Sequence, residues 1–512
     1  MLLGSLLLSA ALAAPAEPAV VYLSAAPSTL DPLFGVTPSD RLVHGLLHDR
    51  LFHPARTGAW SRLVDAWSVD GTEATITLVK GRSWHDGHPI DAGDVCFTLE
   101  ALLQPRTPAP DGPRVRSNVS ACRLAPDDPR TAVVTLWAPA DEEEVAQVLA
   151  VPLAPQHAYH SSTITGDPRV QAQAIGAGPY RLQQRHADGV LELEATSGDL
   201  PFDRLVLAPG STAYANAWSV AEHGAAATAW VPPAALSMVR EAGDVGLYPF
   251  DRLVAWSVAL NVHRPVLADP AARHGLDRLL DRQALRRAMS GGDDPGRDEH
   301  PWPLVSGPYG ADSERLSRGI RPPTRDEQQA ATWLEQAGWT QRDDGRWLSA
   351  EGEPVTLRIA VLRGHGFPPA AIGPALGWTG IEVELEVVGP QEWLASVWAG
   401  GHREHCDAVL LPRPLFPTDD PSPWFATRDE RTGWGNVFDV SDPAIDDLLR
   451  RAADPTDPGS VEVARQLHGE LADRRWHLFL FEERAWTAWR GPWSAWVPAP
   501  YDGWSRIDRW RR

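Results

Sequence analysis

The sequence has no apolar run long enough to cross a membrane as a helix, which takes about 20 residues. One apolar stretch, residues 2–13, is too short and ends in Ala11-Leu12-Ala13. A short apolar segment ending in small-x-small is typical of a secretory signal peptide, although neither Lys nor Arg precedes it here. No Cys follows it, which argues against a lipid anchor. We therefore expect residues 1–13 to be a signal peptide that directs export through the inner membrane to the periplasm.

Cysteine is scarce, with Cys96, Cys122 and Cys406 as its three occurrences. An odd number leaves at least one cysteine unpaired within the chain. Cys96 lies on the apolar side of a predicted helix, and Cys122 precedes a predicted strand. In an oxidising compartment these two could form a disulfide. Buried free thiols are the alternative, and the spacing leaves both open.

Positive charge is in the minority, with 47 Lys and Arg against 67 Asp and Glu, a net charge of −20 and a pI near 5.3. This balance excludes nucleic-acid binding driven by bulk charge.

The chain of 512 residues is too long for one hydrophobic core, so two or three domains are expected. Trp is unusually frequent, with 23 residues, and its large amphipathic side chain suits ligand clefts as well as cores.

Catalytic and metal-binding motifs are also missing. Neither Gly-x-Ser-x-Gly nor His-Glu-x-x-His occurs. His85 and His88 flank the turn dipeptide Asp86-Gly87 and supply only two of the three or four ligands that a metal site needs. The segment from His402 to Cys406 groups three candidate ligands without a paired fourth. We therefore predict no catalytic residue, no cofactor and no metal site.

Residues 66–103 form the unit around which the chain is organised. Residues 75–78 alternate polar and apolar side chains, as in a half-buried strand, and Asp86-Gly87 predicts a tight turn. Asp91 can then cap a helix, with Asp94 in its first turn facing the positive end of the helix dipole. One face of this helix is apolar and consists of Val95, Leu99, Leu102 and Leu103.

Residues 78–95, Leu-Val-Lys-Gly-Arg-Ser-Trp-His-Asp-Gly-His-Pro-Ile-Asp-Ala-Gly-Asp-Val, resemble the signature of the family 5 extracellular solute-binding proteins. These are the peptide- and nickel-type receptors of ABC importers. Shorter segments resemble other family motifs and follow one another in the family's order: Pro27-Ser28-Thr29-Leu30-Asp31-Pro32, Gly176-Ala177-Gly178-Pro179-Tyr180, Leu280-Asp281-Arg282 and Ala337-Gly338-Trp339.

The resemblance implies an α/β fold with the two lobes of a type II periplasmic-binding protein, an extra small subdomain and a hinge-closed ligand cleft. The expected division is lobe I at residues 20–50, 178–258 and 485–512, the subdomain at 51–177, and lobe II at 259–484. Strands are expected at residues 131–136, 191–195, 205–208, 254–260, 355–362, 381–388 and 407–411. Helices are expected at residues 41–52, at 141–149, at 212–240 with a break at Pro232-Pro233, and after a capping box from Thr324 to Glu327.

The function implied is that of a monomeric substrate-binding component of an ABC importer. It would bind an oligopeptide-like or other organic solute between the lobes and deliver it to a permease in the inner membrane, without catalysis. Two alternatives stay open: a receptor for a non-peptide ligand, such as a metal chelate or a saccharide, and a sensor or enzyme derived from the same fold.

Peptide-type relatives hold the ligand ammonium with an Asp in a segment like Trp-x-Ala-Asp-Tyr-x-Asp-Pro. The matching segment here runs from Arg413 to Pro421, and the position of that Asp falls on Phe416 or Pro417. Asp419 could replace it only if the loop shifts. This departure argues against the usual mode of binding a free peptide N-terminus.

Two cations are better placed to bind an anionic group. Arg363, next to Gly364-His365, follows one predicted strand and Arg413 follows another, and α/β folds bind ligands beyond the carboxyl ends of strands. We expect one of them to engage a carboxylate; the alternative is that both are surface residues at loop tips. The candidate ligand-binding set is His48, Arg363, His365, Trp393, Arg413, Phe416 and Asp419, with Phe416 and Trp393 as apolar walls.

Overall fold

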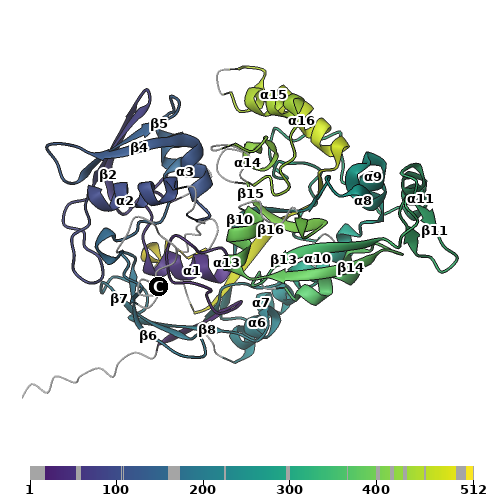
Figure 1. Cartoon of the computed structure of the whole chain (residues 1–512). Helices are drawn as coiled ribbons and strands as arrows, with labels where there is room; N and C mark the ends of the chain where they lie inside the picture. Colours follow the sequence, from purple (N-terminus) through teal and green to yellow (C-terminus); the bar gives the residue numbers. More distant parts are fainter. Residues whose placement is uncertain are drawn as a thin grey trace, which may run out of the picture.

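The structure is a computed structural model (Figure 1) that describes residues 18–53, 59–104, 107, 109–159, 173–223, 226–295, 300–365, 367–398, 404–415, 420–429, 435–454, 457–491, 503–504 and 506–510. The expected signal peptide lies outside these residues. Within them, no helix combines the length and the apolar character that crossing a membrane requires.

The chain folds as a mixed α/β protein around one ten-stranded sheet. The strands lie in the order β14 (Glu382–Val388), β13 (Thr356–Leu362), β15 (Ala408–Pro414), β10 (Val245–Leu260), β16 (His477–Arg490), β9 (Ala227–Thr228), β1 (Ala19–Leu23), β8 (Arg204–Pro209), β7 (Leu191–Ala195) and β6 (Tyr180–Arg185). The strands β14, β13 and β15 lie on one side of β10 and β16 in this order, and β9, β1, β8, β7 and β6 lie on the other side.

Two long antiparallel strands, β10 and β16, join the lobes at the centre of Figure 1. The first half of β10 pairs with the second half of β16, which continues to β9; the second half of β10 pairs with both β16 and β15. The β10–β16 register shifts between Asp251 and Ala255. Leu253 lies in that interval with φ of 50°, a left-handed conformation that costs a non-glycine residue free energy. A second shift follows between Ala255 and Ser257, so the β10–β16 ladder is irregular from Asp251 to Ser257.

A separate four-stranded sheet, in the order β2 (Val64–Asp70), β3 (Glu73–Leu78), β5 (Thr131–Leu136) and β4 (Val119–Leu124), forms the subdomain at the upper left of Figure 1. Three helices belong to it: α2 (Ala92–Leu103), α3 (Gly112–Asn118) and α4 (Glu142–Val148). Its buried apolar side chains form one core cluster, which also takes in Leu33, Phe34 and Val36 from the first lobe.

Twelve more helices lie among the described residues outside this subdomain. They are α1 (Pro38–Leu47), α6 (Ala213–Glu222), α7 (Leu236–Glu241), α8 (Pro265–Ala268), α9 (Pro270–Leu279), α10 (Arg282–Ser290), α11 (Glu327–Gln336), α12 (Ile372–Leu376), α13 (Pro390–Glu392), α14 (Ser422–Phe425), α15 (Pro443–Ala452) and α16 (Ser460–Arg474). Short 3-10 or π segments are η1 (Gln156–Ala158), η2 (Pro233–Ala235), η3 (Pro369–Ala371), η4 (Trp393–Trp398) and η6 (Ile507–Arg509), and β11 (Thr340–Gln341) pairs with β12 (Trp347–Leu348).

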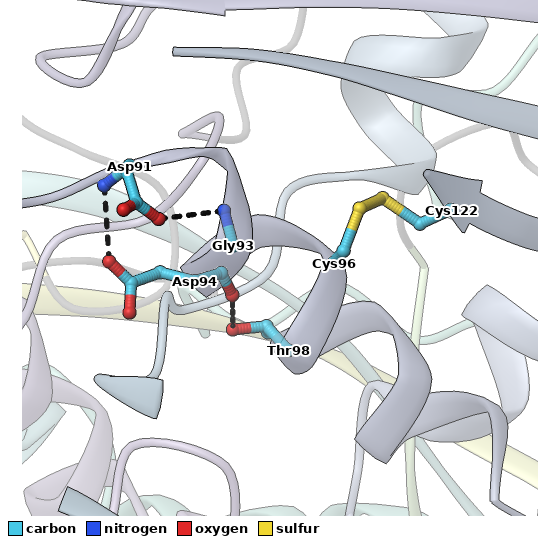
Figure 2. The surroundings of a disulfide bond; sticks show 6 residues. All are labelled: Asp91, Gly93, Asp94, Cys96, Thr98 and Cys122. Atoms are coloured by element: carbon cyan, nitrogen blue, oxygen red, sulfur yellow. Dashed lines mark hydrogen bonds between the residues drawn. A yellow bond between two sulfur atoms is a disulfide. The ribbon is translucent and has the colours of Figure 1, made fainter. Parts of the chain in front are cut away.

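The predicted strand–turn–helix unit is confirmed. Asp91 caps α2 by accepting from the backbone N–H of Gly93, and the Asp94 carboxylate accepts from the N–H of Asp91 (Figure 2). The disulfide left open by the sequence is present, because Cys96 on α2 is bonded to Cys122 on β4. Cys406 is a buried free thiol.

Several expected boundaries are wrong. The helix expected at residues 41–52 is α1, which begins earlier because Thr37 and Asp40 form a capping box. The capping box at Thr324 does not form, since Asp326 caps α11 by accepting from the N–H of Gln329. The expected helical stretch 212–240 contains β9, whose small side chains fit between β1 and β16. The strands expected at 254–260 and 407–411 are longer, because β10, β15 and β16 pair over their extensions.

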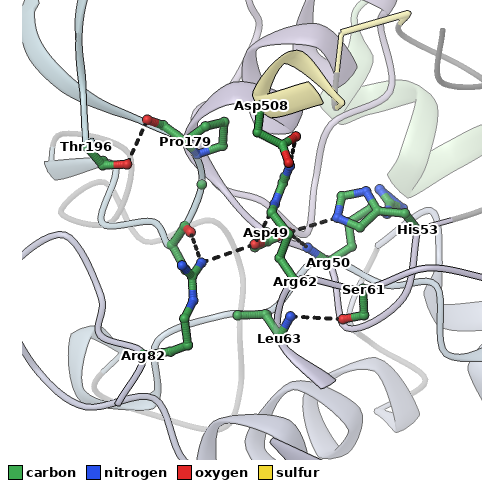
Figure 3. A network of polar contacts seen from close by, with 12 residues as sticks. Asp49, Arg50, His53, Ser61, Arg62, Leu63, Arg82, Pro179, Thr196 and Asp508 are labelled. Carbon is green, nitrogen blue, oxygen red and sulfur yellow. Dashed lines mark hydrogen bonds and ion pairs between the residues drawn. The ribbon is translucent and has the colours of Figure 1, made fainter. Parts of the chain in front are cut away.

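A buried carboxylate connects the subdomain with a segment near the C-terminus (Figure 3). Asp49 Oδ1 lies 2.8 Å from His53 Nε2, and Arg62 Nε donates to Asp49 Oδ2 at 3.0 Å. The same guanidinium donates to Asp508 at 2.8 Å. Burial alone would raise the pKa of Asp49, but Arg62 and the hydrogen bond from His53 outweigh it and hold the pKa well below its usual range. Asp49 is therefore ionised and serves to hold His53 and Arg62 in place.

Candidate functional site

Three segments meet where the two lobes adjoin: the N-terminus of α1, the loop that follows β13, and the irregular part of the β10–β16 ladder. Gly364 in the loop has φ of +98°, and a Cβ at this position would lie 3.1 Å from Cγ2 of Thr37, the residue that caps α1. A side chain here would meet both backbone strain and this contact. Glycine therefore lets the loop of one lobe rest on the first turn of a helix in the other.

The acidic residue of that first turn, Asp40, already accepts hydrogen bonds from neighbouring groups. The carboxylate of Asp40 accepts hydrogen bonds from the N–H and the hydroxyl of Ser28, and from the N–H groups of Val36 and Thr37, at 2.6 to 3.1 Å. Arg41 follows it in the sequence, on the same turn of the helix. The negative charge of Asp40 is thus engaged by local backbone donors at the helix terminus.

A buried ion pair lies at the irregular part of the ladder. Arg252 on β10 donates to the carboxylate of Glu483 on β16, and both residues are buried. The indole Nε1 of Trp256 donates to the other carboxylate oxygen of Glu483 at 3.3 Å. Since both oxygens are engaged, Glu483 neutralises Arg252 and fixes the position of Trp256.

His365, in the loop that follows β13, packs against Trp256. Its ring lies edge-on to Trp256, with centroids 5.0 Å apart. Burial lowers the pKa of His365 well below 6.5, and the charges of Arg252 and Arg41 lower it further. The imidazole is therefore neutral at pH 7, and its buried Nε2 has no hydrogen-bond partner in the described structure. A neutral ring with an unused nitrogen can donate to an acceptor or accept from a donor.

Arg363 is the exposed cation of the junction. It follows β13 directly, as the sequence predicts, and its N–H donates to the carbonyl of Val388 at 2.9 Å. Its side chain is exposed, and within the described residues its guanidinium takes part in no hydrogen bond or ion pair. Arg363 is thus an exposed cation next to Gly364, while the carboxylates of Asp40 and Glu483 already have partners.

Arg413 has a different setting. It lies inside β15, not beyond it, and is buried; its guanidinium donates to the carbonyls of Pro308 and Gly307 at 3.1 and 3.4 Å. It also stacks near the rings of Phe425 and Phe479. Burial lowers its pKa to about 9. No carboxylate contacts it among the described residues. Beside it lies a small pocket lined by Leu260, Trp424, Phe425, Asn436, Val437, Phe438, Val440, Trp476 and His477.

The other predicted residues lie elsewhere. His48 is buried, its Nε2 lies 3.0 Å from the carbonyl of Leu30, and its ring lies against Gly176. Trp393 is buried in a core cluster of the second lobe. Phe416 and Asp419 lie outside the described residues. The structure therefore brings Arg363 and His365 together and separates them from His48.

Sequence reasoning missed Arg41, Arg252 and Glu483. The available signal was the pair Asp251-Arg252 between Phe250 and Leu253-Val254, because adjacent charges interrupt an otherwise apolar strand. In the structure this interruption falls where the β10–β16 register shifts.

Comparisons with known proteins agree with this architecture. A family model described as bacterial extracellular solute-binding proteins, family 5 Middle, matches residues 57–402. Protein XP55 of Streptomyces lividans is 28% identical over 468 residues, which cover 86% of this chain and 79% of that protein.

Three solved structures share the fold over nearly the whole chain. The oligopeptide-binding protein AppA from Bacillus subtilis, in complex with a nonapeptide, has a TM-score of 0.77 and 16% identity and covers 96% of this chain and 98% of its own. AgaA from A. tumefaciens R10, in complex with agropinic acid, has a TM-score of 0.78 and 17% identity, with coverage of 96% and 98%. NikZ from Campylobacter jejuni, in complex with Ni(L-His), has a TM-score of 0.74 and 15% identity, with coverage of 98% and 100%.

Proposed function

Because the chain belongs to the bacterial extracellular solute-binding proteins of family 5, we propose that it captures an organic solute with a carboxylate or similar anionic group between its two lobes. It then delivers the solute to an ABC permease in the membrane. As a solute-binding protein, it binds its ligand without transforming it. The periplasm, reached by a cleaved signal peptide at residues 1–13, is the proposed compartment, and a monomer is the proposed state.

The proposal that the ligand is anionic rests on the guanidinium of Arg363, which takes part in no hydrogen bond or ion pair within the described residues. It is exposed at the carboxyl end of β13, beside a loop that contacts the other lobe through Gly364 and Thr37. The nearby carboxylates of Asp40 and Glu483 are engaged by other donors. A ligand carboxylate could therefore form a charge-assisted contact with Arg363 without displacing an existing partner. The neutral ring of His365 offers a further polar contact.

Lobe closure is the proposed mechanism. The proposed boundaries are lobe I at residues 20–50, 178–258 and 485–512, lobe II at 259–484, and the subdomain at 51–177. We place the hinge at the register shift between Asp251 and Ala255, since the β10–β16 ladder is interrupted there. Closure would then bring more of the first lobe onto the loop that carries Arg363.

The class of solute is proposed more broadly than peptide alone. The relatives hold a nonapeptide, agropinic acid and Ni(L-His), and each of these contains a carboxylic acid or its anion. An oligopeptide-like ligand bound through its carboxylate fits the sequence better than one bound through its ammonium, because no Asp stands at the position that peptide-type relatives use. Metal chelates, saccharides and a sensor role are the alternatives that the experiment separates.

The test uses peptides of two to nine residues, each with a free C-terminal carboxylate or a C-terminal amide, and titration calorimetry at low salt. We expect the free acids to bind and the amides to bind at least about tenfold more weakly. Arg363→Ala should remove this preference, whereas Arg346→Ala, which removes an exposed Arg from the β11–β12 hairpin, should not. Equal binding of acids and amides, or an unchanged preference in Arg363→Ala, would reject the proposed role.

If no peptide binds, native mass spectrometry of the protein isolated from its own host identifies the co-purifying solute. A neutral saccharide found there would reject the anionic ligand. A hydrolysed or otherwise altered product formed by the pure protein would reject the whole transport proposal.

A further inference from the structure

One cluster of metal-binding side chains lies on the subdomain, outside the junction described above. Asp86 and His88 come from the turn that follows β3, and His157 comes from η1, which is 71 residues further along the chain than Asp86. The sequence pointed to His85 and His88 at this turn; in the structure His85 Nε2 lies 3.0 Å from the carbonyl of Gly178, and Asp86 and His157 join His88 instead. The ligating atoms of all three side chains lie within 4.8 Å of one another.

We propose that Asp86, His88 and His157 form a binding site for a divalent transition-metal ion of the zinc type, with the remaining coordination positions open to water or to a donor from another molecule.

The distances suit a shared ion. Asp86 Oδ2 lies 2.8 Å from His157 Nε2 and 3.2 Å from His88 Nδ1. Ligand atoms at about 2.1 Å from a tetrahedral zinc ion are about 3.4 Å from one another, so only small rotations of the side chains are needed to admit the ion. The imidazoles of His88 and His157 also stack on each other, with centroids 4.1 Å apart.

The site is held by its neighbours before any ion binds. The N–H of Gly87 donates to the carbonyl of Trp84 at 2.9 Å, and the N–H of His88 donates to Asp86 Oδ1, so the turn that carries two ligands is closed. Gly87 has φ of +91°, which this turn requires and which few other residues adopt. The turn therefore presents Asp86 and His88 in one fixed orientation.

Asp94, on the first turn of α2, ties the two segments together. One of its carboxylate oxygens accepts from the N–H of Gln156, the residue before His157, at 2.9 Å. The other accepts from the indole of Trp84, two residues before Asp86, at 3.1 Å. A buried carboxylate that positions both ligand-bearing segments is the kind of support that metal sites use.

The charge and exposure of the cluster fit a cation that stays in contact with solvent. The carboxylate of Asp86 is the acidic ligand, and its Oδ2 is the atom that both His157 Nε2 and His88 Nδ1 approach. The side chains of Asp86 and His157 are each 28% exposed and that of His88 is 60% exposed. Two imidazoles and a carboxylate favour Zn²⁺, Ni²⁺, Co²⁺ or Cu²⁺ over Mg²⁺ and Ca²⁺, which prefer oxygen ligands alone.

The experiment uses the full mature chain without an affinity tag, freed of metal by a chelator and then titrated with Zn²⁺ in a calorimeter. We expect one tight equivalent, which is weakened by about tenfold or more in His88→Ala and in His157→Ala. His88 is the most exposed of the three, so its replacement leaves the fold intact. His186→Ala is the matched control, because His186 has a carboxylate partner, Glu192, at 2.9 Å but no second imidazole. It should bind Zn²⁺ as the wild type does.

A second readout identifies the coordination directly. Co²⁺ bound at this site should give visible absorption that Zn²⁺ abolishes and that His157→Ala lacks, whereas Mg²⁺ and Ca²⁺ should not compete. Absence of a tight equivalent, or a tight equivalent that survives both His88→Ala and His157→Ala, would overturn the proposal.

Discussion

The guanidinium of Arg252 and the carboxylate of Glu483 form a buried ion pair across the β10–β16 ladder, at the place where its register shifts. Side chains of both residues are less than a tenth exposed. The pair therefore replaces, with one charged contact, the regular backbone bonds that the ladder loses at this place.

Removing the negative member of this pair should destabilise the protein strongly. Glu483→Gln leaves Arg252 buried without a counter-charge, and breaking a buried pair in this way costs about 3–5 kcal/mol. Asp244→Asn is the control, because it breaks the pair with Arg490, in which Asp244 is 59% exposed, and should cost less than about 1 kcal/mol. Urea unfolding of both variants measures the difference. Equal losses would contradict the structural role given to Glu483.

Replacing Arg363 or Arg413 should affect different properties. Arg363→Ala removes an exposed side chain, so the free energy of unfolding should change by less than about 0.5 kcal/mol while solute affinity falls. Arg413→Ala leaves a buried cavity and deprives the carbonyls of Gly307 and Pro308 of a donor, so it should cost about 2–5 kcal/mol. Thermal unfolding and calorimetry on the same samples separate the two. Wild-type stability of Arg413→Ala would show that this Arg has no structural role.

His53 should make stability depend on pH. Burial is the main cause that lowers its pKa to about 4, against 6.5 in the unfolded chain, while Arg62 and Arg50 lower it further and Asp49 opposes them. Between pH 6.5 and 4 the unfolded state binds more protons, so stability falls as the pH falls through this window. At about 1.4 kcal/mol per pKa unit, the total is about 3 kcal/mol.

His53→Gln should flatten this dependence, because the variant has no imidazole to protonate. The measurement is the difference in the free energy of unfolding between wild type and variant at pH 7, 6, 5 and 4.5. Protonation of Asp49 does not contribute to this difference, since its pKa is lowered below 3.8 and the stability that its charge provides is lost only in stronger acid. A difference that stays constant from pH 7 to 4.5 would contradict the prediction.

Counting reactive thiols tests the assigned disulfide. Cys406 is buried, and burial raises the pKa of its thiol to about 12, so the native protein should not react with a maleimide at neutral pH. In denaturant without reductant one thiol should react, and after reduction three should react. Two or three reactive thiols before reduction would show that Cys96 and Cys122 are not paired.

Removal of the disulfide has a calculable effect. Its cysteines are 26 residues apart, and closing a loop of that size stabilises the folded state by about 3.5 kcal/mol in the chain-entropy model. Replacing both cysteines by serine should lower the stability of the subdomain by an amount of that order.

Elements whose signals are local could be predicted from the sequence. The strands β5 and β7 have the bounds that were expected, and Asp91 caps α2 as its position indicates. What failed depended on distant partners. The extra residues of β10 and β15 are strand because they pair with neighbouring strands. The short strand β9 forms because it pairs with β1 on one side and β16 on the other.

The candidate site was predictable only in part for the same reason. Arg363 could be placed at the end of β13 because strand ends are visible in the sequence. The partners of a cation are not visible, so the burial of Arg413 and the pairing of Arg252 with Glu483 had to come from the fold. His157 is the clearest case, since nothing near it in the sequence indicates that it meets Asp86.

The order of strands in the large sheet also constrains how the chain is made. The strand β16, which lies at the centre of the sheet, is contributed by residues 477–490, after every other strand has left the ribosome. Until those residues emerge, β9 and β10 lack their shared neighbour and the two halves of the sheet remain separate. A chain that ends before His477 therefore cannot assemble the complete sheet, whatever the state of its other strands.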